Sequence, residues 1–208
     1  MRKLVVLVLV LVIVAGLLSI VDVTARAATE TSVAHRIQGD VPGSQASVQI
    51  SSFPFLGRLA ASGNIPEATI DITNAAAGPV VFDHIHLQVH DLKVGVGHLL
   101  QRRITLESIR SADVTAEISQ ASLSRLSPIP ITIGAGTVGV AGIQIPAQLS
   151  VAGNRLVVTA GAFRFPLVIP VLVVLPCMGG ATLVPGAVDF SCQTTSLPSA
   201  LAGAVVSF

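Results

Sequence analysis

The first part of the chain is dominated by an unbroken apolar run over residues 4–21. The run follows the basic pair Arg2-Lys3 and ends at Asp22. Its 18 residues exceed the core of a typical signal peptide and are just enough to span a bilayer, with the basic flank cytoplasmic. Ala25-Arg26-Ala27 is a small-x-small site for cleavage after Ala27. We therefore interpret residues 1–27 as either a cleaved signal peptide or a retained transmembrane anchor.

Two helices are predicted before the main strand region. Residues 23–38 carry apolar side chains at rough helical spacing and predict a helix that ends before Gly39. Residues 55–62 predict a second, shorter helix that stops at Gly63. Residues 47–51, between them, alternate as a short strand.

From Glu67 onward the alternation of apolar and polar residues is typical of strands. The clearest strand covers residues 80–94, where Ile85, Leu87 and Val89 face one way and His84, His86, Gln88 and His90 face the other. Further strands are expected at 70–73, 104–118 (with a bulge), 131–133, 138–140, 143–149 and 156–160, a turn at 74–78, and a short helix at 120–126 capped by Ser119. The pattern predicts an α+β protein that is mostly antiparallel β.

The composition is apolar and poor in charge: 51% of residues are hydrophobic and 11% are charged, with a formal net charge of +1. These values exclude a disordered chain, and they leave no basic face for nucleic acid. Trp and Tyr are absent, which removes the usual platforms for stacking bases. Residues 28–208 are long enough for a single domain with a substantial core, and export would place this domain outside the cytoplasm, in the cell envelope or periplasm or secreted.

Cys177 and Cys192 are the only two cysteines and lie 15 positions apart. In an exported protein such a pair usually forms a disulfide, which would stabilise the fold by roughly 3 kcal/mol for a loop of this size. Two free thiols are the alternative interpretation. A disulfide that stabilises the fold is the one we favour.

No motif indicates catalysis, so we expect neither an enzyme nor a cofactor. Residues 134–139 match G-x-G-x-x-G, but alternating residues follow where a dinucleotide site needs a helix, so we expect a glycine-rich turn. His84, His86 and His90 share one strand face and could hold zinc in a metal-dependent hydrolase. A polar stripe facing solvent is the interpretation that we favour, and we expect no metal.

The apolar excess requires either a tightly packed core or an apolar cavity. The run at residues 163–176 contains three prolines and is too short to span a bilayer, so we expect an extended segment covered by apolar groups. Such a cavity would suit lipid acyl chains, because each buried CH₂ contributes roughly 0.8 kcal/mol. Five phenylalanines could line such a cavity, although for any single one we favour a place in the ordinary core: Phe53, Phe55, Phe82, Phe163 and Phe165.

The block Val48-Gln-Ile-Ser-Ser-Phe-Pro-Phe-Leu-Gly-Arg-Leu, followed by Gly63, resembles the "GFPFL" block of the LmeA family of actinobacterial phospholipid-binding envelope proteins. Ser52 stands where that block favours glycine. Residues 118–126, the cysteine loop and the final Leu-Pro-x-x-Leu are also similar. The resemblance covers about residues 20–208.

This resemblance implies an extracytoplasmic phospholipid-binding protein of the cell envelope that supports lipoglycan or mannan assembly, with a phosphatidylinositol-type phospholipid and the membrane as partners. It also implies a curved sheet wrapped around a long helix with a lipid-binding groove, a fold similar to tubular lipid-binding modules. Phe53, Phe55 and Leu56 match the family's most recognisable motif and are candidate lipid-binding residues. The alternative is a non-catalytic envelope scaffold that binds a membrane enzyme without holding lipid.

Overall fold

The computed structural model describes residues 2–41, 43–77, 80–95, 103–125, 131–140, 142–152, 155–161, 163–168, 177, 179–195 and 205–207. Within these ranges, side chains are described except at 2–12, 77, 103–104, 151–152, 155, 163–168 and 205–207.

Three helices and thirteen strands are described, and the protein is α+β and mostly antiparallel β, as the sequence predicts. The helices are α1 (Arg2–Asp40), α2 (Phe55–Ser62) and α3 (Gln120–Ser124). The strands are β1 (Gln45–Ile50), β2 (Asn64–Ala77), β3 (Val80–Gly95), β4 (Arg103–Ser108), β5 (Ser111–Ser119), β6 (Ile131–Gly134), β7 (Thr137–Val140), β8 (Ile143–Ala152), β9 (Arg155–Ala160), β10 (Phe163–Val168), β11 (Gly180–Val184), β12 (Ala187–Thr194) and β13 (Val205–Ser207).

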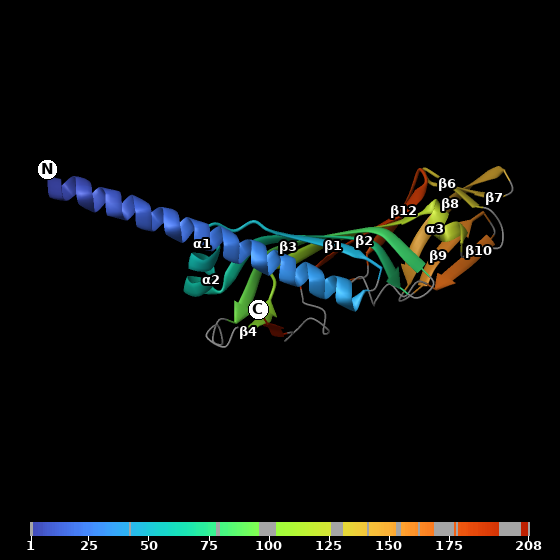
Figure 1. The fold of residues 1–208 in the computed structure, drawn as a ribbon. Helices are drawn as coiled ribbons and strands as arrows, with labels where there is room; N and C mark the ends of the chain where they lie inside the picture. Colours follow the sequence, from blue (N-terminus) through green and yellow to red (C-terminus); the bar gives the residue numbers. More distant parts are fainter. Residues whose placement is uncertain are drawn as a thin grey trace.

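The strands form two sheets, and every pairing among the described residues is antiparallel. The first sheet has the order β1-β2-β3-β5-β12-β11, and in addition β4 pairs with β3 and β13 pairs with β4. The second sheet has the order β10-β9-β8-β7-β6 and lies at the end of the molecule away from the N-terminus (Figure 1).

Helix α1 is continuous over 39 residues, so the apolar run and the helix expected at 23–38 form one rod about 58 Å long. Its N-terminal part extends beyond both sheets (Figure 1). Residues 13–21 are exposed around the whole circumference, whereas from Asp22 onward one side of the helix is partly buried. Among the side chains that the structure describes, which in α1 begin at Ile13, no helix is both long and apolar enough to span a membrane.

The partly buried side of α1 recurs at positions four apart: 25–26, 29–30, 33–34 and 37–38. Four residues turn an α-helix by about 400°, so this stripe advances by about 40° per repeat. The surface of β1 and α2 against which α1 lies therefore turns slowly about the helix axis, and the fold combines a long N-terminal helix with open curved sheets.

Helix α1 covers the free edge of β1, the first strand of the sheet. The carboxylate of Glu30 accepts a hydrogen bond of 2.7 Å from the backbone N–H of Ile50. Gln38 donates through its amide to the carbonyl oxygen of Ala46, at 3.3 Å. Eight helical residues and four strand residues both span about 12–13 Å, so the two contacts match in spacing. Side chains of α1 thus bind backbone groups to which a further strand would otherwise bind.

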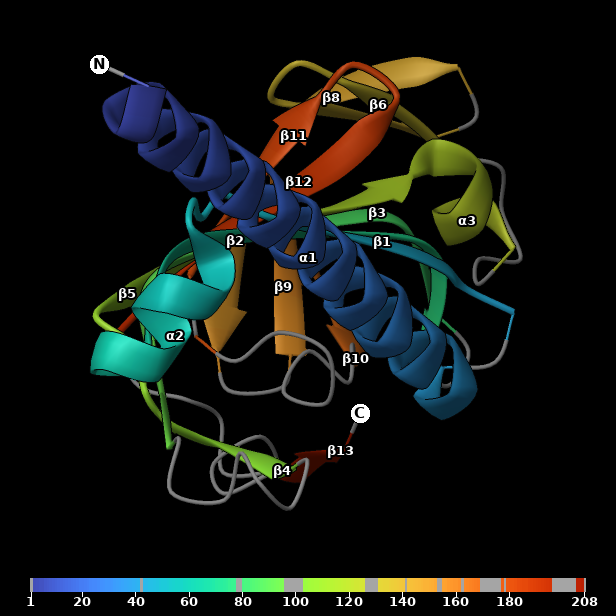
Figure 2. The same cartoon turned by 60° about the vertical axis from the view of Figure 1, so that its left-hand side comes forward.

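Asp22 joins the two N-terminal helices. Its Oδ2 and Oδ1 accept hydrogen bonds from the backbone N–H groups of Phe55 (2.8 Å) and Leu56 (2.6 Å). The N-cap position of α2 is Pro54, whose side chain makes no capping hydrogen bond, so Asp22 caps α2 from another helix. Asp22 is only 6% exposed, and its carboxylate lies at the positive end of α2. Figure 2 shows α2 lying beside α1.

The strands β2 and β3 change the face that they bury at two places. In the middle of β3 the buried residues, Ile85 and Val89, have odd numbers. Nearer the two ends the buried residues, Phe82 and Val94, have even numbers, so the strand buries its other face there. The changes coincide with Asn74 on β2 (φ 57°) and Asp91 on β3 (φ 49°), the non-glycine residues described with positive φ. Asn and Asp tolerate this backbone region better than other side chains, so they can reverse the alternation within a strand.

Two larger clusters fill the core as a result. At the distal end Phe82, Ile118 and Leu156 pack between the two sheets, with Phe82 and Phe190 edge to face at 6.3 Å. Near the N-terminal helices, α2 packs onto the sheet. The buried members of this second cluster are Ile50, Phe55, Leu59, Ile65 and Val94.

Several boundaries differ from those predicted. Residues 74–77, expected as a turn, continue β2, because Asn74 redirects the strand without ending it. Residues 104–118 form two strands, β4 and β5, and not one bulged strand. The helix expected at 120–126 is described only over Gln120–Ser124, with Ser119 accepting from the N–H of Ser122 as predicted. Residues 134–139 lie in the β6–β7 hairpin, whose turn is formed by residues 135–136, in agreement with the expected glycine-rich turn.

Replacing Asp22 tests the cap of α2. Asp22→Ala is expected to lower the free energy of unfolding of the full chain by about 1–2 kcal/mol, because two N–H groups at the start of α2 lose their acceptor. Urea denaturation in detergent, followed by far-UV circular dichroism, measures the change. Asp40→Ala is the control, because Asp40 is exposed at the end of α1; its effect is expected to stay within about 0.5 kcal/mol. Equal losses in both variants would contradict the capping role.

Candidate functional site

The first sheet carries an apolar face built from residues in direct register. One row runs across five strands, each residue opposite the next. Its members are Val48, Ile70, Leu87, Val114 and Cys192. Four interstrand spacings of about 4.8 Å make this row about 19 Å long.

A second apolar row lies two residues along each strand, about 7 Å from the first. It crosses six strands in register through Ala46, Ile72, Ile85, Ala116, Phe190 and Ala181. We call these two rows together the apolar face.

The apolar face is covered unevenly. Ile85, Val114 and Phe190 are buried, whereas Ile70, Ile72 and Leu87, in the middle of the sheet, are only half-buried. Apolar side chains in the centre of a sheet normally lose nearly all contact with water, since their burial drives folding. The half-buried residues therefore define a surface suited to an apolar ligand.

The disulfide lies at one end of the first row. Cys192 is bonded to Cys177, with 5.9 Å between the two Cα atoms, which confirms the predicted pairing. Cys177 directly follows the proline-rich run at residues 163–176. Residues 163–168 form β10, as an extended segment, and residues 169–176 lie outside the described part of the chain.

The opposite face of the same sheet is polar. Asp71 Oδ1 lies 2.7 Å from Nδ1 of His86 and 3.6 Å from Nε2 of His84. His90 lies apart from them, with its Nε2 3.6 Å from Oδ2 of Asp113. The three histidines predicted to share a face do so, but His90 does not join the other two around one point.

The candidate lipid-binding phenylalanines do not gather at one site. Phe55 is 2% exposed and belongs to the cluster under α2, and Phe82 lies fully buried in the distal cluster. Phe163 and Phe165 lie on β10, and their side chains are outside those described. Contact of these residues with lipid stays a prediction.

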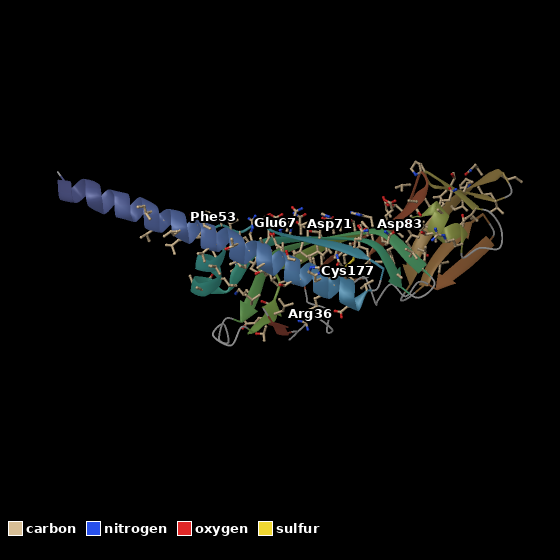
Figure 3. All side chains as sticks on the ribbon, viewed as in Figure 1. Arg36, Phe53, Glu67, Asp71, Asp83 and Cys177 are labelled. Atoms are coloured by element: carbon tan, nitrogen blue, oxygen red, sulfur yellow. A yellow bond between two sulfur atoms is a disulfide. The ribbon has the colours of Figure 1, made fainter. Side chains whose placement is uncertain are left out.

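Phe53 and Leu56 have a different environment. Phe53 is 66% exposed and Leu56 is 37% exposed. Phe53 lies near α1, just before α2 (Figure 3), and the backbone N–H of Leu56 binds Asp22 on α1. The family-like block thus divides into a buried residue, Phe55, that packs α2 onto the sheet and two exposed apolar residues next to the N-terminal helix.

The alternation around Ile70 and Leu87 was predictable from the sequence, whereas the role of these two residues was not. Each belongs to a predicted strand with one apolar face, which is the signal that could have found them. Their assembly into a row depends on the register between strands, and the sequence pattern of one strand does not specify it.

The fold and the half-covered apolar face define a β-rich protein suited to binding an apolar ligand. A sequence model of the LmeA-like phospholipid-binding family matches residues 20–205, nearly the whole chain. The chain therefore belongs to the LmeA-like phospholipid-binding family, and this membership supports phospholipid binding. No curated protein and no solved structure matches the chain.

Removal of the disulfide is expected to affect stability more than lipid binding. Cys177→Ser should lower the free energy of unfolding by about 3 kcal/mol, because the unfolded chain loses a closed loop of 15 residues. Thermal denaturation gives the change, and lipid binding at low temperature should persist. The native protein under reducing conditions is the matched control and should show the same shift. An unchanged melting temperature in both would refute the stabilising role.

Proposed function

We propose that the protein is a phospholipid-binding protein of the cell envelope that holds acyl chains against the apolar face. The observation that carries this proposal is the half-buried state of Ile70, Ile72 and Leu87 in the middle of the sheet. The first row is about 19 Å long. That length is comparable to the roughly 15 Å that one leaflet contributes to a hydrocarbon core of about 30 Å.

The protein acts outside the cytoplasm and keeps its N-terminal helix as a membrane anchor. Two features support retention over cleavage after Ala27. Asp22 precedes the cleavage site and caps α2, so a cleaved chain would lose this contact. The family match also begins at residue 20, before that site. The apolar run at 4–21 is long enough to cross a bilayer, and its basic flank favours an extracytoplasmic body.

The role of the protein is to bind or carry lipid and not to catalyse a reaction. Membership of a lipid-binding family supports this role. A phosphatidylinositol-type head group and support of lipoglycan or mannan assembly are the more specific form of the proposal, and both follow from the family resemblance.

The first experiment is native mass spectrometry, with lipid extraction, on the full chain released from mild detergent. A phospholipid bound at about one per chain is expected. A bare protein mass that does not change after incubation with vesicles containing phosphatidylinositol would overturn the proposal and favour an envelope scaffold that binds a membrane enzyme. The mass of the chain recovered from membranes also tests whether residues 1–27 are retained.

A pair of variants assigns the bound lipid to the apolar face. Ile70→Thr keeps a β-branched side chain in β2 but adds a hydroxyl to the first row, so the lipid that co-purifies should fall several-fold. Thr69→Ala alters the adjacent position, which faces the polar side, and should leave the lipid unchanged. Circular dichroism confirms that both variants fold. Equal lipid content in the two variants would place the lipid elsewhere.

A further inference from the structure

The surface around the start of α2 joins two groups of exposed apolar side chains. Asp22 binds the backbone of Phe55 and Leu56, which fixes the start of α2 at the level of residue 22 on α1. Phe53 and Leu56 are exposed at this level. On the N-terminal side of it, α1 exposes large apolar side chains, which include Ile13, Val14, Leu17, Leu18, Ile20 and Val21.

The exposed part of α1 suits lipid better than a protein partner. A helix that packs on a protein needs an apolar stripe on one side, whereas a helix that is apolar all round is typical of a membrane. Residues 13–21 are exposed and almost entirely apolar around the helix, and no charge occurs between Lys3 and Asp22. Among the described side chains of α1, which begin at Ile13, Asp22 is the first that is buried, and it marks where the body of the protein begins.

We propose that Phe53 and Leu56 form a second point of membrane contact, inserting into the lipid interface beside the place where α1 leaves the bilayer. This inference rests on the proposed membrane attachment of α1. A single helix leaves the body free to rotate about the helix axis, whereas two points of contact fix its orientation. The apolar face then keeps one orientation relative to the bilayer, and the bilayer is the source of the lipid that this face binds.

The chain contains no Trp and no Tyr, so one introduced tryptophan is its only strong fluorophore. Phe53→Trp in the full chain is reconstituted into phosphatidylcholine vesicles with brominated acyl chains. The emission of this variant is expected to shift to shorter wavelength and to be quenched, at a depth of about 5–10 Å below the head groups. Ile143→Trp is the matched control, because Ile143 is 67% exposed on β8, in the second sheet; it should stay unquenched.

The outcomes separate the two proposals. If the full chain fails to float with the vesicles, the proposed membrane attachment is wrong. If it floats but the Phe53→Trp variant is no more quenched than the Ile143→Trp variant, attachment holds and the second contact is wrong. Quenching in the Phe53→Trp variant that is lost on adding Leu56→Ser, while flotation persists, would show that the two side chains insert together.

A second, independent observation concerns the polar face. Asp71 on β2 lies directly opposite His86 on β3, and His84 lies two residues away on the same face. One ligand atom from each of the three residues lies within 4.8 Å of the other two. Zinc binds nitrogen and oxygen ligands at about 2.0–2.2 Å, so its ligand atoms stand about 3–4 Å apart.

We infer that Asp71, His84 and His86 form a binding site for a divalent transition metal such as zinc, contrary to the expectation from the sequence alone. The neighbouring strands β2 and β3 hold the ligand atoms of the three residues close together. The three side chains are partly exposed, which leaves room for a water as the fourth ligand. Asp71 comes from β2, whereas the two histidines lie on β3, so the spacing of the histidines in the sequence did not indicate it.

Titration of the full chain in detergent with zinc chloride tests this site by calorimetry. One saturable zinc per chain is expected, with binding lost in His86→Gln. His90→Gln is the matched control, because His90 shares the strand and the face and also lies near a carboxylate, and it should bind zinc normally. Absence of saturable binding, or an equal loss in both variants, would overturn the site.

Discussion

The N-terminal half of the structure depends on one contact: the carboxylate of Asp22 accepts hydrogen bonds from the backbone N–H groups of the first two residues of α2. A buried carboxylate is costly unless hydrogen bonds compensate for the lost water, and here two N–H groups at a helix start provide them. The contact fixes where α1 stops being exposed and begins to pack. It also sets the position of the family-like block, with Phe55 inside and Phe53 outside.

The long sheet meets two requirements that strands with uninterrupted alternation cannot meet together. Its middle must present one apolar and one polar face, while its ends must bury side chains in two separate clusters. The positive-φ residues Asn74 and Asp91 resolve this conflict by reversing the alternation at each end. The middle section can then leave Ile70 and Leu87 half-buried, because the clusters at the two ends provide much of the hydrophobic stabilisation.

The local elements could be predicted from the sequence because their signals are local. The alternation in β3 predicted the right faces for Leu87 and His86, and Gly63 ended α2 as expected. Contacts between distant residues were not predictable: Asp22 meets Phe55 across 33 positions, and the first apolar row joins residues from Val48 to Cys192. Asn74 was predicted to lie in a turn because asparagine tolerates positive φ, which is typical of turns. In β2 the same positive φ reverses the alternation of the strand without ending it.

The cover that α1 gives to β1 has a consequence for assembly. Glu30 and Gln38 occupy backbone groups at the end of an eight-stranded sheet, where an open strand would pair with another chain. Since both residues follow Ala27, they would remain even in a shortened chain, but the helix that presents them would lose the part held by Asp22. Fraying of that helix would expose these backbone groups as a template for pairing with another chain.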